Sequence, residues 1–315
     1  MYEMQHLNLT TNKFFVSNDG KTLLLSQNIE GSYFSEILIY EKSDGSSFQV
    51  TQKFRPNEFY IGMIMLLNKD IILSGRHFII ICKKDGKFQY TKSQSIRDTD
   101  WAEITILKEF ENKKFGASGY GGFFVFEQKD GGDYHNYYSL SRAELDEQRW
   151  TTDFIEIKEK KDSYILCGID KAFIIDNRKI INKISFNGLD QKGIFQHDYF
   201  CRFKDDIYIL CLNDYIDLIN TKENKFNRIF IKKVEKGFDI LNIFKYDKNC
   251  IILISRNEIL IIQIFNNETI QINIRINYNH FFKACKFLEE EKSIYFINKT
   301  DEICKIQFNK KLNYI

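Results

Sequence analysis

The sequence is poor in proline and has no long apolar segment. Pro56 is the only proline among its 315 residues. No apolar run approaches the roughly 20 residues that a membrane-spanning helix needs. Residues 1–10 lack both the basic and the apolar segments of a secretory signal peptide. We therefore expect an intracellular protein, most simply a cytoplasmic one, that does not insert into a membrane.

Paired cysteines are also missing. The chain has an odd number of cysteines and no Cys-x-x-Cys pair; they are Cys82, Cys167, Cys201, Cys211, Cys250, Cys285 and Cys304. Disulfide frameworks are typical of small secreted chains with paired spacings. We expect reduced thiols that serve as small core residues.

Motifs for metal binding and catalysis are not found by their spacing. None of the five histidines forms a His-x-His or His-x-x-x-His pair, and no cysteine or carboxylate lies at zinc-ligand spacing from one of them. No nucleophile elbow or phosphate-binding loop is present. The glycine cluster Gly116–Gly122 lies between two predicted strands, so we interpret it as a turn. The sequence thus predicts no metal, no cofactor, no catalytic residue and no enzymatic activity.

Charge of one sign does not dominate. The 45 basic and 43 acidic side chains leave a net charge of +2. A nearly neutral chain has no overall field that would attract nucleic acid or an anionic membrane, so nucleic acid is not the expected partner. The hydrophobic fraction of 43% is nevertheless enough for a large core.

The chain contains a sevenfold repeat. Very apolar segments recur 43 to 48 residues apart, and each is followed by a turn and another strand-like segment. The predicted second strands of the repeat are Thr22–Ser26, Asp70–Gly75, Phe115–Gly119, Ser163–Gly168, Ile207–Leu212, Cys250–Ser255 and Ser293–Asn298. A period in the forties with four strands per repeat is typical of a β-propeller.

The other strands follow the same period. The predicted third strands are Glu36–Tyr40, Phe78–Cys82, Phe123–Glu127, Ala172–Asp176, Ile216–Asn220, Glu258–Ile262 and Glu302–Ile306. Five fourth strands are predicted at Phe48–Lys53, Phe88–Lys92, Ile180–Phe186, Phe226–Lys232 and Thr269–Ile274. Between third and fourth strands lie turn residues such as Asp130-Gly131-Gly132, which favour tight hairpins.

These features predict an all-β fold: one domain over residues 1–315, a seven-bladed propeller of four-stranded antiparallel blades. Met4–Leu9 precedes the first repeat and is placed like a fourth strand. We expect it to join the last blade and close the ring, which removes an exposed sheet edge. The alternative is that Leu312–Ile315 supplies that fourth strand.

Two segments resemble a known family. Residues 15–26 (FVSNDGKTLLLS) resemble the first hairpin of WD40 blades, and residues 100–127 resemble a WD40 half-blade. Departures from the WD40 pattern are clear, because no Gly-His dipeptide opens a blade and no Trp-Asp pair closes one. Phe126-Glu127, Tyr40-Glu41 and Ile175-Asp176 stand where Trp-Asp would be. The resemblance implies a degenerate WD40-like propeller without the His–Asp hydrogen bonds of the family.

The resemblance also implies a function. WD40 propellers hold other proteins, so we expect a non-catalytic scaffold for protein–protein interaction, a monomeric propeller that acts as an adaptor or subunit in a larger complex. The alternative is an enzyme, or a small-molecule or nucleic-acid binder, that uses the central funnel. The insertions Gln27–Ser35 and Ser141–Thr152 point to one face, and Ser141 with Glu144 has the spacing of a capping box around one helical turn.

Candidate contact residues come from the turns after the second strands and from the segments before the first strands. Trp and Arg are favoured anchors in such contacts. The predicted protein-binding residues are Arg76, His77, Trp101, Tyr120, Arg149, Trp150, Asp170, Lys171, Asp214 and Tyr215.

Overall fold

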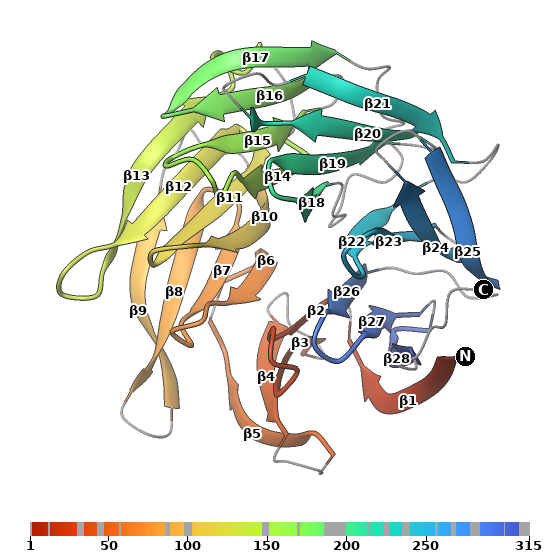
Figure 1. The fold of residues 1–315 in the computed structure, drawn as a ribbon. Coiled ribbons are helices and arrows are strands. Elements are labelled where there is room, and N and C mark those ends of the chain that lie inside the picture. Colours follow the sequence, from red (N-terminus) through yellow and green to blue (C-terminus); the bar gives the residue numbers. More distant parts are fainter. Residues whose placement is uncertain are drawn as a thin grey trace.

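The computed structural model shows a closed ring of seven β-sheets (Figure 1). It describes residues 2–11, 13–29, 35–42, 47–56, 58–85, 89–97, 103–146, 151–168, 171–185, 200–212, 215–222, 227–234, 240–255, 258–265, 269–277, 284–298 and 300–308. Each sheet has four antiparallel strands, and six of the seven are built from consecutive strands of the chain. The seven-bladed propeller predicted from the repeat is therefore confirmed.

The blades are numbered in chain order. Blade 1 contains β2 (Lys13–Val16), β3 (Thr22–Asn28), β4 (Ser35–Glu41) and β5 (Gln49–Phe54). Blade 2 contains β6 (Tyr60–Met65), β7 (Ile71–Gly75), β8 (Phe78–Asp85) and β9 (Gln89–Arg97). Blade 3 contains β10 (Glu103–Phe110), β11 (Lys114–Tyr120), β12 (Gly122–Gln128) and β13 (Tyr134–Ser141). Blade 4 contains β14 (Asp153–Glu156), β15 (Tyr164–Cys167), β16 (Lys171–Asp176) and β17 (Lys179–Ser185).

The remaining blades follow the same plan. Blade 5 contains β18 (Phe200–Lys204), β19 (Ile207–Leu212), β20 (Tyr215–Asn220) and β21 (Asn227–Lys233). Blade 6 contains β22 (Asn242–Lys245), β23 (Cys250–Ile254), β24 (Glu258–Phe265) and β25 (Thr269–Asn277). Blade 7 contains β26 (Ala284–Leu288), β27 (Ser293–Ile297), β28 (Glu302–Phe308) and β1 (Tyr2–Thr10).

The predicted strands coincide with the observed ones to within a few residues. The fourth strand of blade 3, β13, was not predicted, because its polar and aromatic residues do not alternate clearly with apolar ones. The expected turns form where the structure describes them. Asn177 and Arg178 both adopt positive φ, as do Gly131 and Gly132, which is the backbone that tight hairpins require. The glycine cluster of blade 3 also forms a turn, with Gly121 and Gly122 at positive φ.

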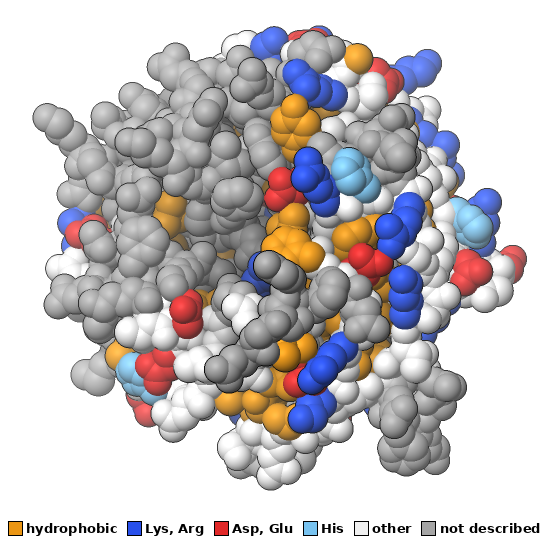
Figure 2. All heavy atoms as spheres, turned by 180° about the vertical axis from the view of Figure 1, so that it is seen from behind, with side chains coloured by type: hydrophobic (Ala, Val, Ile, Leu, Met, Phe, Trp, Pro, Cys, Tyr) orange, Lys and Arg blue, Asp and Glu red, His pale blue; other side chains and the backbone are white. Residues whose placement is uncertain are grey.

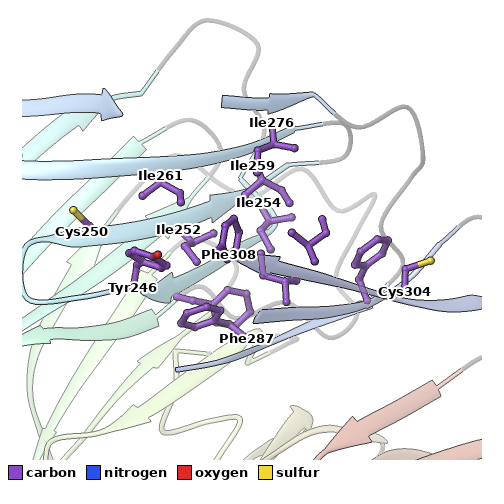
Figure 3. Packing of buried hydrophobic residues seen from close by; sticks show 14 residues of the cluster. Tyr246, Cys250, Ile252, Ile254, Ile259, Ile261, Ile276, Phe287, Cys304 and Phe308 are labelled. Carbon is purple, nitrogen blue, oxygen red and sulfur yellow. The ribbon is translucent and has the colours of Figure 1, made fainter. Parts of the chain in front are cut away.

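The core is divided among the contacts between neighbouring blades. The second and third strands are apolar on both faces, so each blade has to be covered on both sides. Within the described residues, seven clusters of buried side chains fill these contacts, one for each pair of neighbours. Figure 3 shows one of them, where Ile252 and Ile261 of blade 6 face Phe287 and Phe308 of blade 7.

Both ends of the described chain meet in blade 7. The first strand, β1, pairs in an antiparallel manner with β28, and His6 lies opposite Cys304 (Figure 1). The expectation that Met4–Leu9 closes the ring is therefore confirmed. The alternative segment, Leu312–Ile315, lies outside the described residues. No segment that the structure describes is a helix of the length and apolar character that crossing a bilayer requires.

Buried polar groups add bonds between the blades. The Asp162 carboxylate is 3% exposed and lies between blades 3 and 4. Its two oxygens accept from Lys114 Nζ at 2.9 Å, Tyr137 Oη at 2.6 Å and Arg178 at 3.0 Å. Burial alone would raise the pKa of Asp162, but these bonds outweigh it and lower the pKa below its usual value.

We predict that Asp162→Asn lowers the free energy of unfolding by about 3 kcal/mol at pH 7, because it leaves the buried Lys114 ammonium with only the more distant Glu127 carboxylate, at 3.7 Å, as a counter-charge. Asparagine tolerates the positive φ of this position, so the backbone stays unstrained. A lowered pKa stabilises the fold above the unfolded-state pKa near ~4, and this stability is lost as the pH falls through the folded-state value. The difference in the free energy of unfolding between Asp162→Asn and the unmodified protein should therefore shrink below about pH 4.

Urea denaturation at several pH values measures this difference. Asp205→Asn is the matched control, because Asp205 is 91% exposed and forms an ion pair with Arg202, three residues before it. The control should unfold like the unmodified protein. A difference for Asp162→Asn that stays constant between pH 7 and pH 3 would contradict the prediction.

Candidate functional site

One face of the ring carries the turns between second and third strands together with the connections between blades. Successive strands of a blade run in opposite directions, so these two kinds of segment emerge at the same end of each blade. We call this the upper face, and we call the opposite one, with the turns between first and second and between third and fourth strands, the lower face. Those predicted contact residues that the structure describes belong to the upper face by this topology.

The structure describes some of these residues. Arg76 and His77 form the turn between β7 and β8, Tyr120 ends β11, and Lys171 begins β16. For Tyr215 only the backbone position, at the start of β20, is described. The other predicted residues, Trp101, Arg149, Trp150, Asp170 and Asp214, lie outside the described residues.

An aromatic side chain that sequence reasoning missed lies beside Arg76. Phe59 is 61% exposed, although it directly precedes a buried strand and reads as part of it. Tyr60 of β6 pairs with Gly75 of β7. Phe59, just before β6, and Arg76, just after β7, therefore lie on neighbouring backbone segments. A Cβ on Gly75 would come within 2.7 Å of the Phe59 carbonyl oxygen, which shows how closely the two segments approach.

Positive charge surrounds this corner of blade 2. The Lys13 ammonium lies 5.7 Å from the centre of the Phe59 ring and donates to the Tyr60 carbonyl at 2.8 Å. Burial lowers the pKa of Lys13, and the Glu103 carboxylate partly opposes that shift. Arg97 forms an ion pair with Glu58. Arg76 is exposed and makes no ion pair with another described residue. We call Lys13, Phe59, Arg76, His77 and Arg97 the basic corner.

Blades 3 and 4 continue the same kind of surface. The Arg142 guanidinium lies 5.6 Å from the centre of the Tyr120 ring and donates to Tyr120 Oη at 3.2 Å. Lys171 and Lys183 both bind Asp146, at 3.0 and 2.6 Å. The two amines share the single Asp146 carboxylate, so one positive charge remains there. In the basic corner Glu58 pairs with Arg97, and Arg76 has no acidic partner among the described residues.

The predicted capping box at the start of the connection after blade 3 forms. Glu144 accepts from both the backbone nitrogen and the hydroxyl of Ser141 at 2.8 Å, and Leu145 N donates to Ser141 O at 3.2 Å. One helical turn therefore anchors this connection, and it holds Leu145 in the apolar cluster between blades 3 and 4.

A cavity of about 970 Å³ runs along the innermost strands β2, β6, β10, β18, β22 and β26. Its described charged lining residues are Lys108, Glu109, Lys245, Lys286, Glu289, Glu290 and Lys292. Lys286 lies in the middle of β26, and the others lie near or beyond the ends of their strands, towards the lower face. Figure 2 shows hydrophobic side chains exposed near the middle of one face of the ring, with Lys and Arg side chains beside them.

One lysine that lines this central cavity, which we also call the channel, already has a structural role. Lys108 Nζ lies 2.6 Å from the fully buried Asp153 carboxylate, which also accepts from Phe200 N at 2.9 Å. Asp153 thereby links blades 3, 4 and 5 at the inner edge of the ring. Asp153 begins β14, so this ion pair is a polar contact at a strand start, and both of its groups are already bound by protein partners.

Comparison with known proteins gives matches in structure but not in sequence. No model of a known protein family matches the chain, and no curated protein matches it in sequence. A structure titled "Crystal structure of RRP9 WD40 repeats" superposes with a TM-score of 0.68 at 9% identity over 98% of both chains. The ring has the fold of WD40-repeat propellers.

Two further solved structures show how widely this fold is used. The "Crystal Structure of Mitotic Checkpoint Complex" contains a chain that matches with a TM-score of 0.71 at 9% identity, over 98% of this chain and 94% of that one. The "Streptogramin B lyase structure" matches with a TM-score of 0.66 at 14% identity over 98% of both chains. At such identities the likeness concerns the fold alone, and it includes a protein named as an enzyme.

The turn at His77 allows a variant that removes a predicted contact side chain and should not lose stability. His77 has a φ of 63°, a conformation that costs an L-residue about 1 kcal/mol and glycine almost nothing. We predict that His77→Gly unfolds at a temperature no lower than the unmodified protein, and that His77→Ala is about 1 kcal/mol less stable than His77→Gly. Thermal unfolding followed by circular dichroism measures both variants. Equal stability of the Gly and Ala variants would show that the turn is not strained.

Proposed function

We propose that this protein is a non-catalytic scaffold that binds other proteins through the upper face of its propeller, as a monomeric adaptor or subunit of a larger intracellular complex. The observation that carries the proposal is the basic corner, where the largely exposed Phe59 ring lies among Lys13, Arg76 and Arg97. Exposed aromatic rings next to arginine are typical anchors of protein interfaces.

The charge of this corner indicates the chemistry of the partner. Glu58 neutralises Arg97, while Arg76 has no acidic partner among the described residues. An acidic segment with an apolar side chain would place carboxylates on Arg76 and Lys13 and cover the Phe59 ring. Trp101 and Trp150, predicted on the same face, would extend the contact into the neighbouring blades.

The alternative is a small-molecule binder or an enzyme that uses the central channel. Lysines and glutamates at its lower mouth could hold a polar ligand. The scaffold is favoured because Lys108 is tied to Asp153 and because the upper part of the channel is mainly apolar.

A triple variant of the basic corner, Phe59→Ser/Arg76→Ser/His77→Gly, tests the scaffold. We expect it to reduce the recovery of specific partners at least about 10-fold in affinity purification from native cells, because it removes the anchor ring and an unpaired cation. Recovery by the unmodified protein should also fall as the salt concentration rises, since exposed charges are screened.

The matched control is Leu67→Ser/Lys113→Gly on the lower face. Leu67 is 76% exposed, and Lys113 is an exposed cation at a φ of 59°, so the control removes similar side chains from similar turns. Both variants should keep the unfolding temperature of the unmodified protein. If the corner variant recovers its partners fully and the control variant loses them, the interface lies on the lower face. Recovery of no partner, together with turnover of a metabolite, would overturn the scaffold.

A further inference from the structure

Three side chains with metal-binding atoms meet where the ring closes. His6 of β1 lies directly opposite Cys304 of β28, so the two side chains emerge on the same face of the sheet. Glu302 lies two residues before Cys304 on β28 and therefore points to that face as well. The ligand atoms of His6, Glu302 and Cys304 all lie within 4.8 Å of one another.

The distances fit one metal ion. His6 Nδ1 lies 3.0 Å from Glu302 Oε2 and 3.7 Å from Cys304 Sγ. A tetrahedral zinc ion with bonds of ~2.0 Å to nitrogen and oxygen and ~2.3 Å to sulfur sets such pairs about 3.3 and 3.6 Å apart. Both His6 distances thus lie within a few tenths of an ångström of those in a shared zinc site, and the Glu302 and Cys304 ligand atoms lie within 4.8 Å of each other. Three protein ligands would leave a fourth position for water.

A buried asparagine orients two of these groups. Asn298 is 5% exposed, and its Oδ1 accepts from the backbone nitrogens of Thr300 and Glu302 at 2.9 and 3.0 Å. These bonds set the direction of the amide, so Nδ2 donates to Glu302 Oε2 at 3.3 Å and approaches Cys304 Sγ at 3.7 Å. Hydrogen bonds of this kind orient metal ligands and favour the thiolate.

Cys304 is fully buried and belongs to the apolar cluster between blades 6 and 7. Its backbone belongs to a strand whose neighbouring inward side chains, Ile306 and Phe308, pack in the apolar cluster between blades 6 and 7. Figure 3 shows Cys304 at the edge of this cluster, with its sulfur directed away from the other side chains. The His6 side chain is 45% exposed and that of Glu302 is 26% exposed, so two of the three groups are in contact with solvent.

We propose that His6, Glu302 and Cys304 bind one zinc ion that ties the first strand of the propeller to the last. Neutral imidazole nitrogen, carboxylate oxygen and thiolate sulfur are all zinc ligands. Binding replaces the proton of the Cys304 thiol by the metal and releases that proton to solvent, so the affinity falls as the pH is lowered. Because the ligands come from opposite ends of the chain, the ion closes a loop of nearly the whole protein.

Zinc binding to the folded ring alone stabilises it. At a free zinc concentration about 100 times the dissociation constant, we expect the unfolding temperature to rise by about 5 °C. This stabilisation by zinc requires the closed ring, because His6 and Cys304 are far apart in the unfolded chain. The site lies beside the turn between β27 and β28 of blade 7, and zinc binding is measured without any protein partner, so its test does not depend on the proposed scaffold function.

The experiment uses untagged full-length protein freed of metal with a chelator and titrated with zinc chloride by calorimetry, and with cobalt(II) by absorption. We expect one ion per chain and a thiolate-to-cobalt charge-transfer band. Cys304→Ser should abolish that band, and His6→Gln should weaken zinc binding at least about 10-fold. Neither variant should gain the rise in unfolding temperature with zinc.

Matched controls keep the result specific. Cys285→Ser removes another thiol of blade 7, and His135→Gln removes an exposed imidazole of blade 3. Both should bind zinc as the unmodified protein does. His6 lies on the surface, so His6→Gln stays folded even if Cys304→Ser does not, and circular dichroism verifies this. Absence of saturable zinc binding by the unmodified protein, or equal binding by His6→Gln, would overturn the proposal.

Discussion

Every blade of this protein is apolar on both of its faces, so no blade can be stable without a neighbour on each side. The seven clusters between blades satisfy this requirement only if the ring is complete. An open ring would leave the last blade with an uncovered face and an unpaired strand edge. The pairing of β1 with β28 completes blade 7 and so closes the ring, and the clusters between the other blades depend on this closure. It also brings the two ends of the described chain together.

Polar groups strengthen the same contacts at chosen points. Asp153 at the inner edge and Asp162 near the lower face each bind groups from neighbouring blades, and both carboxylates are almost completely buried. Such groups add direction to an otherwise apolar interface, because they are satisfied in only one alignment of the blades. In blade 2, Phe59 and Arg76 of the upper face remain exposed, and Lys13 of blade 1 donates to the Tyr60 carbonyl beside them. A closed ring whose basic corner exposes Phe59 and Arg76 is suited to holding a partner.

Much of the architecture could be predicted because the local sequence of each repeat indicates its own strands and turns. Apolar second strands such as Ile207–Leu212 and turn pairs such as Asn177-Arg178 are local signals, and their period sets the number of blades. The closing strand could be predicted as well, since Met4–Leu9 occupies the place of a fourth strand. The strand β13 was missed because its cross-strand partners, rather than its own pattern, make it a strand. Phe59 was missed because an aromatic residue before an apolar strand reads as buried.

The sequence by itself determined the all-β fold, the sevenfold repeat and the end of each blade at which the turns with Arg76, His77, Tyr120 and Lys171 lie. These properties follow from short-range periodicity and turn chemistry. Only the tertiary structure decided which distant residues meet. His6 and Cys304 are separated by almost the whole chain, and no spacing rule can pair them before the ring closes. The exposure of Phe59 beside Arg76 was likewise decided by the pairing of Tyr60 with Gly75. Contacts of this kind depend on register and closure, which are properties of the packed ring.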